Sequence, residues 1–137
     1  ACVDAIESLD SSALASKIDA RATGTLPVFV EVNVSGEATK HGCAPSDVAA
    51  LIDAVEASAH LQLAGFMTVG LNSPVEADVR AAYAQLRGIR DEAAARLGIN
   101  ESDLALSMGM SRDLQWAIAE GATIVRLGTA VFGARRV

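Results

Sequence analysis

The chain alternates, from one end to the other, between short apolar segments typical of β-strands and longer amphipathic segments typical of helices. The clearest strand pattern covers residues 28–34, where a near-continuous apolar run is typical of a parallel strand buried on both faces. Further strands are expected at residues 3–6, 63–69, 104–106 and 124–127, and helices at 11–22, around 48–55, from the turn at 72–74 to residue 97, and at 111–121. No two strands are close enough in sequence to form a hairpin. The pattern therefore predicts parallel βαβ units with right-handed crossovers.

No linker rich in Pro, Gly or Ser interrupts this alternation. With 137 residues, 51% of them hydrophobic, residues 1–137 are expected to form a single α/β domain. Five βα units fit either a doubly wound open sheet or part of a (β/α)8 barrel, because a whole barrel takes about 250 residues. A phosphate site built by the last two βα turns is typical of barrel strands seven and eight. Counted back from such a site, the five strands would be strands four to eight, and the first three would be missing.

Charge and composition argue against two classes of partner. The net charge is −6 and the only basic cluster is at residues 135–136, whereas nucleic-acid binding depends on neutralising many phosphates. No apolar run approaches the roughly 20 residues that span a membrane, and the N-terminus lacks a signal-peptide pattern. Cys2 and Cys43 lack CxxC spacing, and His41 and His60 form no metal-ligand cluster. We therefore expect a cytoplasmic protein with reduced thiols, no bound metal and a small-molecule ligand.

The strongest functional signal lies in two turns near the carboxyl terminus. The first leads from the strand at 104–106 into a helix that ends at Gly121, with Ser111 as its expected N-cap; the second follows the strand at 124–127. Unpaired N–H groups, hydroxyls and closely approaching glycine backbone suit the oxygens of a phosphate. The residues that would surround it are Ser107, Met108, Gly109, Ser111, Gly128 and Thr129. Ordinary caps and turns would use the same residues, so both interpretations stay open.

Arg126 favours a ligand site. Strand alternation places Ile124, Arg126 and Gly128 on one face of the strand. A parallel strand is normally covered on both faces, so this guanidinium must be paired or directed at a ligand. The alternatives are a structural ion pair with an acidic neighbour and a side chain that extends to solvent at the strand tip.

Four segments together resemble the pyridoxal-phosphate homeostasis protein family, which has the alanine-racemase-like barrel fold. They are VDAIESLDSSALASKI, VFVEVNVSGEATKHGC, LAGFMTVG and, most specifically, LSMGMSRDLQWAIAEGATIVRLGTAVFGAR. They span nearly the whole chain in the family's order and spacing. The departures are mild, with Phe66 where leucine is commoner and Leu127 where isoleucine is frequent.

The resemblance implies that the ligand is pyridoxal 5'-phosphate. Ser107 and Ser111, with the backbone of Met108, Gly109, Gly128 and Thr129, would then surround its phosphate, and Arg126 would face the pyridine nitrogen. A cation there disfavours protonation of that nitrogen and suppresses carbanion chemistry, which agrees with a family of cofactor carriers and regulators without an established turnover reaction. Asn33 either lines the same cavity or is a structural amide that caps the following loop. Met67 and Thr68 are expected to pack in the core.

The family binds the cofactor aldehyde covalently, through a lysine on the first barrel strand, and that strand is not in this sequence. The two lysines are Lys17, on a predicted outer helix, and Lys40, in a loop where solvation keeps its pKa high. Neither is assigned as the covalent site, so the cofactor site could be empty or hold a phosphate or sulfate. The chain starts at Ala1 without an initiator methionine, which suggests a fragment of a barrel. Such a piece exposes strand edges and is expected to associate with the missing segment or with itself.

Two other functions remain open. One is an amino-acid racemase-like enzyme that uses pyridoxal phosphate on the same barrel. Such enzymes usually need a second acid/base residue, often a tyrosine, and the lone Tyr83 falls in a helix predicted to lie outside the barrel. The other is an unrelated phosphate-binding barrel enzyme in which Arg126 would clamp a substrate.

Overall fold

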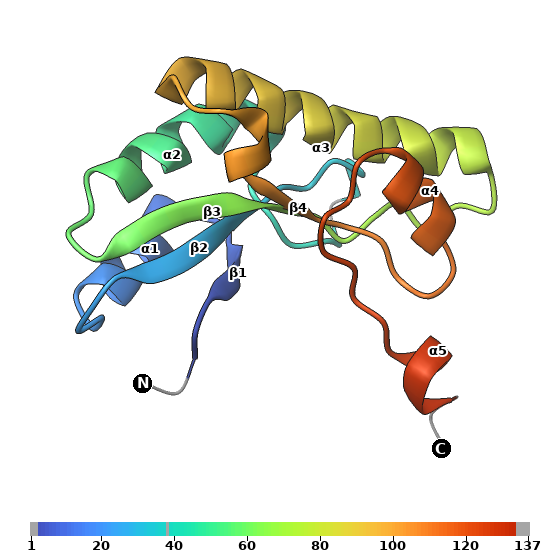
Figure 1. The fold of residues 1–137 in the computed structure, drawn as a ribbon, viewed down its shortest axis with the longest axis horizontal. Helices are drawn as coiled ribbons and strands as arrows, with labels where there is room; N and C mark the ends of the chain where they lie inside the picture. Colours follow the sequence, from blue (N-terminus) through green and yellow to red (C-terminus); the bar gives the residue numbers. More distant parts are fainter. Residues whose placement is uncertain (1–2, 38, 134–137) are drawn as a thin grey trace.

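The computed structural model describes residues 3–37 and 39–133, which form a parallel sheet covered by helices on one side (Figure 1). The sheet has four strands in the order β1-β2-β3-β4, so each strand lies beside the next one in sequence. The strands are β1 (Ile6–Leu9), β2 (Leu26–Glu31), β3 (Leu61–Met67) and β4 (Ala105–Ser107). The α-helices are α1 (Ser12–Asp19), α2 (Val48–Glu56), α3 (Glu76–Leu97), α4 (Leu114–Ala119) and α5 (Thr129–Phe132), and the 3-10 turns are η1 (Pro45–Asp47) and η2 (Glu101–Asp103). Cys2 and the basic pair at residues 135–136 lie outside the described residues.

Local sequence signals place several boundaries correctly. Ser11 is the N-cap of α1, at the start of the helix predicted at 11–22, and its side chain accepts a hydrogen bond from the Leu14 N–H. Helix α3 ends at Leu97 because Gly98 adopts a left-handed conformation with φ 68°. β1 begins three residues later than predicted, whereas β2 and β3 begin two residues earlier.

The predicted fifth strand at 124–127 is wrong. Only an isolated parallel bridge between Ser107 and Ile124 forms there. Ile124 donates to the Leu106 carbonyl and accepts from the Met108 N–H, as in a parallel ladder. The next bond of that ladder is lost, because Gly109 turns the backbone at φ 93° and its carbonyl accepts the Arg126 N–H instead. The described residues therefore contain four strands of the five that we predicted.

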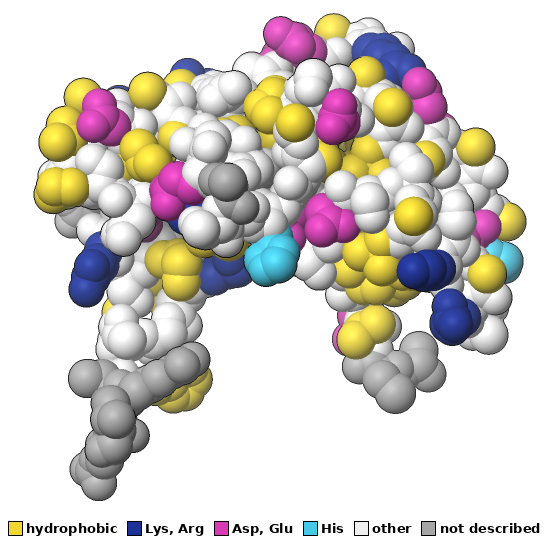
Figure 2. All heavy atoms as spheres, turned by 180° about the vertical axis from the view of Figure 1, so that it is seen from behind, with side chains coloured by type: hydrophobic (Ala, Val, Ile, Leu, Met, Phe, Trp, Pro, Cys, Tyr) yellow, Lys and Arg dark blue, Asp and Glu magenta, His cyan; other side chains and the backbone are white. Residues whose placement is uncertain are grey.

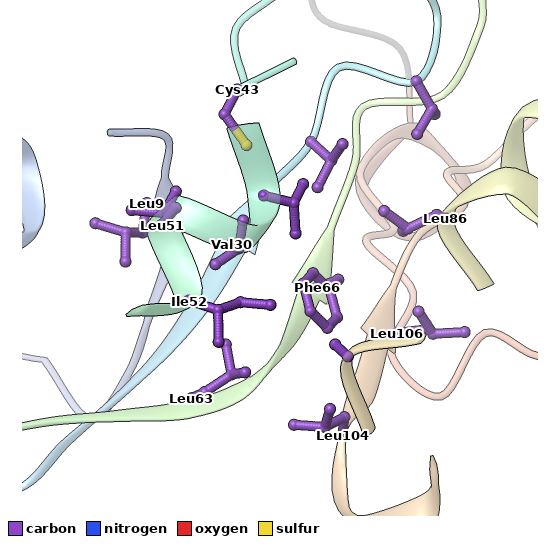
Figure 3. Close-up of a cluster of buried hydrophobic side chains, with 14 of the residues drawn as sticks. Leu9, Val30, Cys43, Leu51, Ile52, Leu63, Phe66, Leu86, Leu104 and Leu106 are labelled. Atoms are coloured by element: carbon purple, nitrogen blue, oxygen red, sulfur yellow. The ribbon is translucent and has the colours of Figure 1, made fainter. Parts of the chain in front are cut away.

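The two faces of the sheet differ in chemistry. Side chains such as Val30, Phe66 and Leu106 point toward the helices and form the main core with Ile52 and Leu86 (Figure 3). Strand alternation turns another set to the opposite, concave face, where the molecule is hollowed between its two ends (Figure 2). This set consists of Glu7, Phe29, Glu31, Met67 and Ser107. No helix within residues 3–37 and 39–133 is long and apolar enough to cross a membrane.

Candidate anion-binding site at the carboxyl end of the sheet

A cavity of about 1090 Å³ opens where β3 and β4 end. Three segments line most of it: the loop after β3, the turn before α4, and the start of α5. Ser111, Gly128 and Thr129, which we predicted to contact a phosphate, are among the lining residues. The other predicted ligand contacts, Ser107, Met108, Gly109 and Arg126, do not line it. The fold thus brings together two turns that sequence analysis could only propose as partners.

Ser111 connects these two turns, although it does not have its predicted role. Helix α4 begins only at Leu114, with Asp113 at the N-cap position, so the prediction that Ser111 is the N-cap is wrong. The Ser111 hydroxyl accepts a hydrogen bond of 3.2 Å from the Ala130 N–H in α5. Asp113 instead holds the turn closed, because its carboxylate accepts the Met110 N–H at 2.7 Å.

Gly109 and Met108 lie between β4 and the turn that borders the cavity, and they shape that turn. The Met108 side chain is fully buried, and its N–H already donates to the Ile124 carbonyl. A Cβ on Gly109 would lie 2.4 Å from the Cβ of Ala117, so only glycine allows α4 to pack this closely. The Met108 N–H is therefore already used by the fold and is not free to bind a ligand, while Gly109 sets the path of the loop.

Arg126 lies against the ends of β3 and β4. Its guanidinium donates to the Thr68 carbonyl at 2.7 Å, and to the Ser107 carbonyl and hydroxyl at 3.0 and 2.7 Å. The Ser107 hydroxyl in turn donates to the Glu7 carboxylate at 2.8 Å. No carboxylate among the described residues forms a direct ion pair with Arg126. The positive charge is thus held at the end of the sheet without being neutralised by contact.

Glu31 lies on the same concave face as Ser107 and is only 5% exposed. Burial raises the pKa of its carboxyl, and the negative charge of Asp10 adds to this, while His41 and Arg126 act in the opposite direction. The interior beside Arg126 is therefore a place where a negative charge is costly unless a cation compensates it.

Asn33 does not line the cavity. Its amide donates to the carbonyls of Glu37 and Lys40, and its side-chain oxygen accepts from the Ser35 hydroxyl and the Gly36 N–H. This is the loop-capping role that we left open beside a ligand contact. Thr68, as predicted, is a packing residue: it is fully buried and its hydroxyl donates to the Val32 carbonyl.

Three residues at the cavity escaped sequence analysis. Lys40 was expected to be solvated, but its side chain is only 16% exposed and lines the cavity. Its Nζ donates to the Gly70 carbonyl at 2.5 Å and pairs with Glu37 at 2.8 Å. The others are Asp113 and Trp116. Asp113 accepts from the backbone N–H three residues before it, a contact that no residue pattern in this turn singles out.

The model of one protein family, described as "Alanine racemase, N-terminal domain", matches residues 2–136. Among curated relatives, a protein of Pseudomonas aeruginosa named "Pyridoxal phosphate homeostasis protein" is 44% identical over 133 residues, which is 95% of this chain and 55% of its own. A human protein of the same name is 34% identical over 137 residues, covering 95% and 50%. This chain spans about half the length of the curated relatives that it matches.

Several solved structures also resemble this chain. An unknown protein from Bifidobacterium adolescentis is 42% identical, with a TM-score of 0.88 over 95% of this chain and 53% of its own. PipY from Synechococcus elongatus, solved with PLP bound, is 31% identical, with a TM-score of 0.78 over 95% and 61%. Alanine racemase from Corynebacterium glutamicum, at 15% identity and a TM-score of 0.73 over 97% and 36%, shares the fold alone. The resemblance to pyridoxal-phosphate homeostasis proteins is confirmed, and the chain belongs to the alanine racemase N-terminal domain family.

Proposed function

We propose that this chain carries the phosphate-binding part of a pyridoxal 5'-phosphate site, in a protein of cofactor homeostasis. The observation that carries the proposal is the single cavity lined by Ser111, Gly128 and Thr129 from two separate turns. The names of the curated relatives, and the PLP bound to PipY, support the choice of ligand.

The donor set fits a phosphate dianion. Ser111 and Thr129 offer hydroxyls, and the N–H groups of Gly128 and Thr129 donate to no other residue in the described part of the chain. Lys40 lines the same cavity. The one carboxylate in the lining, Asp113, already accepts two hydrogen bonds and is not left to compete for these donors.

Arg126 would face the pyridine nitrogen of the bound cofactor, as the family resemblance implies. When bound, pyridoxal phosphate supplies a reactive aldehyde and an electron-withdrawing ring. A fixed guanidinium disfavours a second positive charge on the adjacent ring nitrogen and so weakens the ring as an electron sink. Ser107 would serve this site by holding Arg126, because its hydroxyl donates to Glu7 and accepts from the guanidinium. A carrier or regulator fits this arrangement better than an enzyme of carbanion chemistry.

The racemase alternative gains no support from Tyr83. This tyrosine lies on α3, in the layer outside the sheet, and its hydroxyl donates to Asp113. We infer that residues 1–137 act as one domain and supply successive units of a (β/α)8 barrel, with β1 to β4 followed by the segment that bridges at Ile124. The edge of β1 would pair with further barrel strands or with a second copy. A cytoplasmic location stays a prediction.

Calorimetric titration with pyridoxal 5'-phosphate, pyridoxal and inorganic phosphate tests the proposal. The wild-type chain should bind the phosphorylated cofactor more tightly than pyridoxal. Arg126→Ala removes the guanidinium that would face the pyridine ring, which three hydrogen bonds hold at the end of the sheet. Loss of that one charged contact, worth about 1.5–3 kcal/mol, should weaken cofactor binding about 10- to 100-fold. Ser107→Ala should cost less, because Arg126 keeps its bonds to the two carbonyls. Equal affinity for pyridoxal and its phosphate would overturn the assignment of the cavity.

A further inference from the structure

A buried tyrosine and an aspartate link the two loops that border the cavity. Tyr83 of α3 is fully buried, and its hydroxyl donates to Asp113 at 2.7 Å. The other carboxylate oxygen of Asp113 accepts the Met110 N–H at 2.7 Å. The pair therefore connects the long helix to the turn that carries Ser111.

The same hydroxyl also lies against the loop after β3. A Cβ on Gly70 would come within 2.3 Å of the Tyr83 oxygen, so this loop packs directly on the phenol. Gly70 lines the cavity, and its carbonyl accepts the Lys40 ammonium. The Tyr83 hydroxyl thus lies between the two loops on either side of the cavity and sets their separation.

The hydrogen bonds that link Tyr83, Asp113 and the Met110 N–H, here called the clamp, explain why a carboxylate lies at the edge of this cavity. A carboxylate beside an anion site repels the anion, by an amount that grows as water is excluded. Here both carboxylate oxygens are turned to donors within the fold. The Tyr83 hydroxyl is buried, so it cannot leave Asp113 without becoming an unsatisfied polar group. Burial raises the pKa of Tyr83, and Asp113 adds to this, so the hydroxyl stays a donor at neutral pH.

The clamp acts on the site through Ser111. This residue lies inside the turn that Asp113 closes, and its hydroxyl accepts the Ala130 N–H. If the turn shifts, Ser111 moves relative to Gly128 and Thr129 in the neighbouring turn. Catalytic and binding groups tolerate displacements of only a fraction of an ångström, so a second layer of this kind decides affinity.

We propose that Tyr83 and Asp113 are positioning residues for the phosphate-binding loops and touch no part of the ligand themselves. This inference rests on the proposed function. It assigns to α3, which contributes nothing to the cavity lining, control over affinity for the phosphate group.

The test compares Tyr83→Phe with wild type in titrations with pyridoxal 5'-phosphate and with pyridoxal. Loss of one hydrogen bond to a charged group predicts about 10-fold weaker binding of the phosphorylated cofactor. The affinity for pyridoxal should change less than about twofold, because the displaced groups are those that bind phosphate. A general loss of structure would lower both affinities together. Ser58→Ala is the matched control, since it also removes a hydroxyl that donates one hydrogen bond, in this case to the Ala54 carbonyl at the end of α2, and should change neither affinity.

Asp113→Asn gives a second, independent measurement. The asparagine keeps the volume and an acceptor for the Met110 N–H but replaces the charged acceptor that faces Tyr83. Because the change also removes repulsion of the anion, the loss of phosphate selectivity should be smaller than in Tyr83→Phe. The double variant should lose no more than Tyr83→Phe alone, because both changes break the same bond. Wild-type selectivity for the phosphorylated cofactor that survives Tyr83→Phe overturns the positioning role alone. A wild-type chain without such selectivity overturns the proposed function and this inference together.

Discussion

Gly109→Ala is the substitution whose cost follows most directly from the geometry. Gly109 has φ 93°, a conformation that costs an L-residue about 1–2 kcal/mol. The added Cβ would lie 2.4 Å from the Cβ of Ala117, whereas carbon atoms in contact prefer about 3.5–4.0 Å. Relief would need α4 to move by about 1 Å, and overpacking of this kind typically costs about 1–3 kcal/mol.

Helix α4 has little freedom to make that movement. Glu120, at its end, pairs with Arg80 and Arg87 of α3, both at 2.7 Å. The two costs therefore add, and Gly109→Ala should destabilise the fold by about 2–5 kcal/mol, a large share of the 5–15 kcal/mol typical of a domain.

Urea unfolding followed by far-ultraviolet circular dichroism measures this loss, as a lower midpoint with an unchanged slope. Gly88→Ala is the matched control: it lies inside α3, where a Cβ meets nothing within 4 Å, so alanine should add about 0.5–1 kcal/mol of stability. An unfolding midpoint for Gly109→Ala equal to that of wild type would refute the reasoning. So would equal shifts of the same sign for the two glycine variants.

Two further predictions concern buried groups. Because burial raises the pKa of Glu31 in the fold, its ionisation costs stability as pH rises above the ordinary glutamate pKa of about 4.3. Urea unfolding should therefore show Glu31→Gln to be more stable than wild type at pH 7 and equally stable near pH 4. A gain in stability that did not depend on pH would contradict this. Burial also raises the pKa of the Cys43 thiol to about 11, so iodoacetamide at pH 8 should leave Cys43 unmodified in the folded chain and alkylate it in urea, as peptide mass spectrometry would show. Equal labelling rates in the two states would exclude the buried thiol.

The sequence by itself determined the features that depend on neighbouring residues. Hydrophobic periodicity predicted the alternation of parallel strands and helices, because each element must bury one stripe or face. The start of α1 near Ser11 and the end of α3 before Gly98 depend on hydrogen bonds and backbone angles within a few residues, so the local sequence indicated both. The motif at residues 106–133 identified both turns that line the cavity for the same reason.

Only the tertiary structure decided how those turns meet. The segment at 124–127 has the residues of a strand, yet its parallel hydrogen bonds end where Gly109 turns the backbone away. No residue pattern within 124–127 could have predicted this, because the cause lies in another segment. Three hydrogen bonds of the site join residues far apart in the sequence. Arg126 donates to Thr68 across 58 residues, Ser107 to Glu7 across 100, and Tyr83 to Asp113 across 30. Such partners depend on sheet order, strand register and the path of each loop, and one polar side chain is compatible with many of these. Periodicity shows which face of an element is buried, whereas the atom that a polar group meets is fixed only when the whole chain packs.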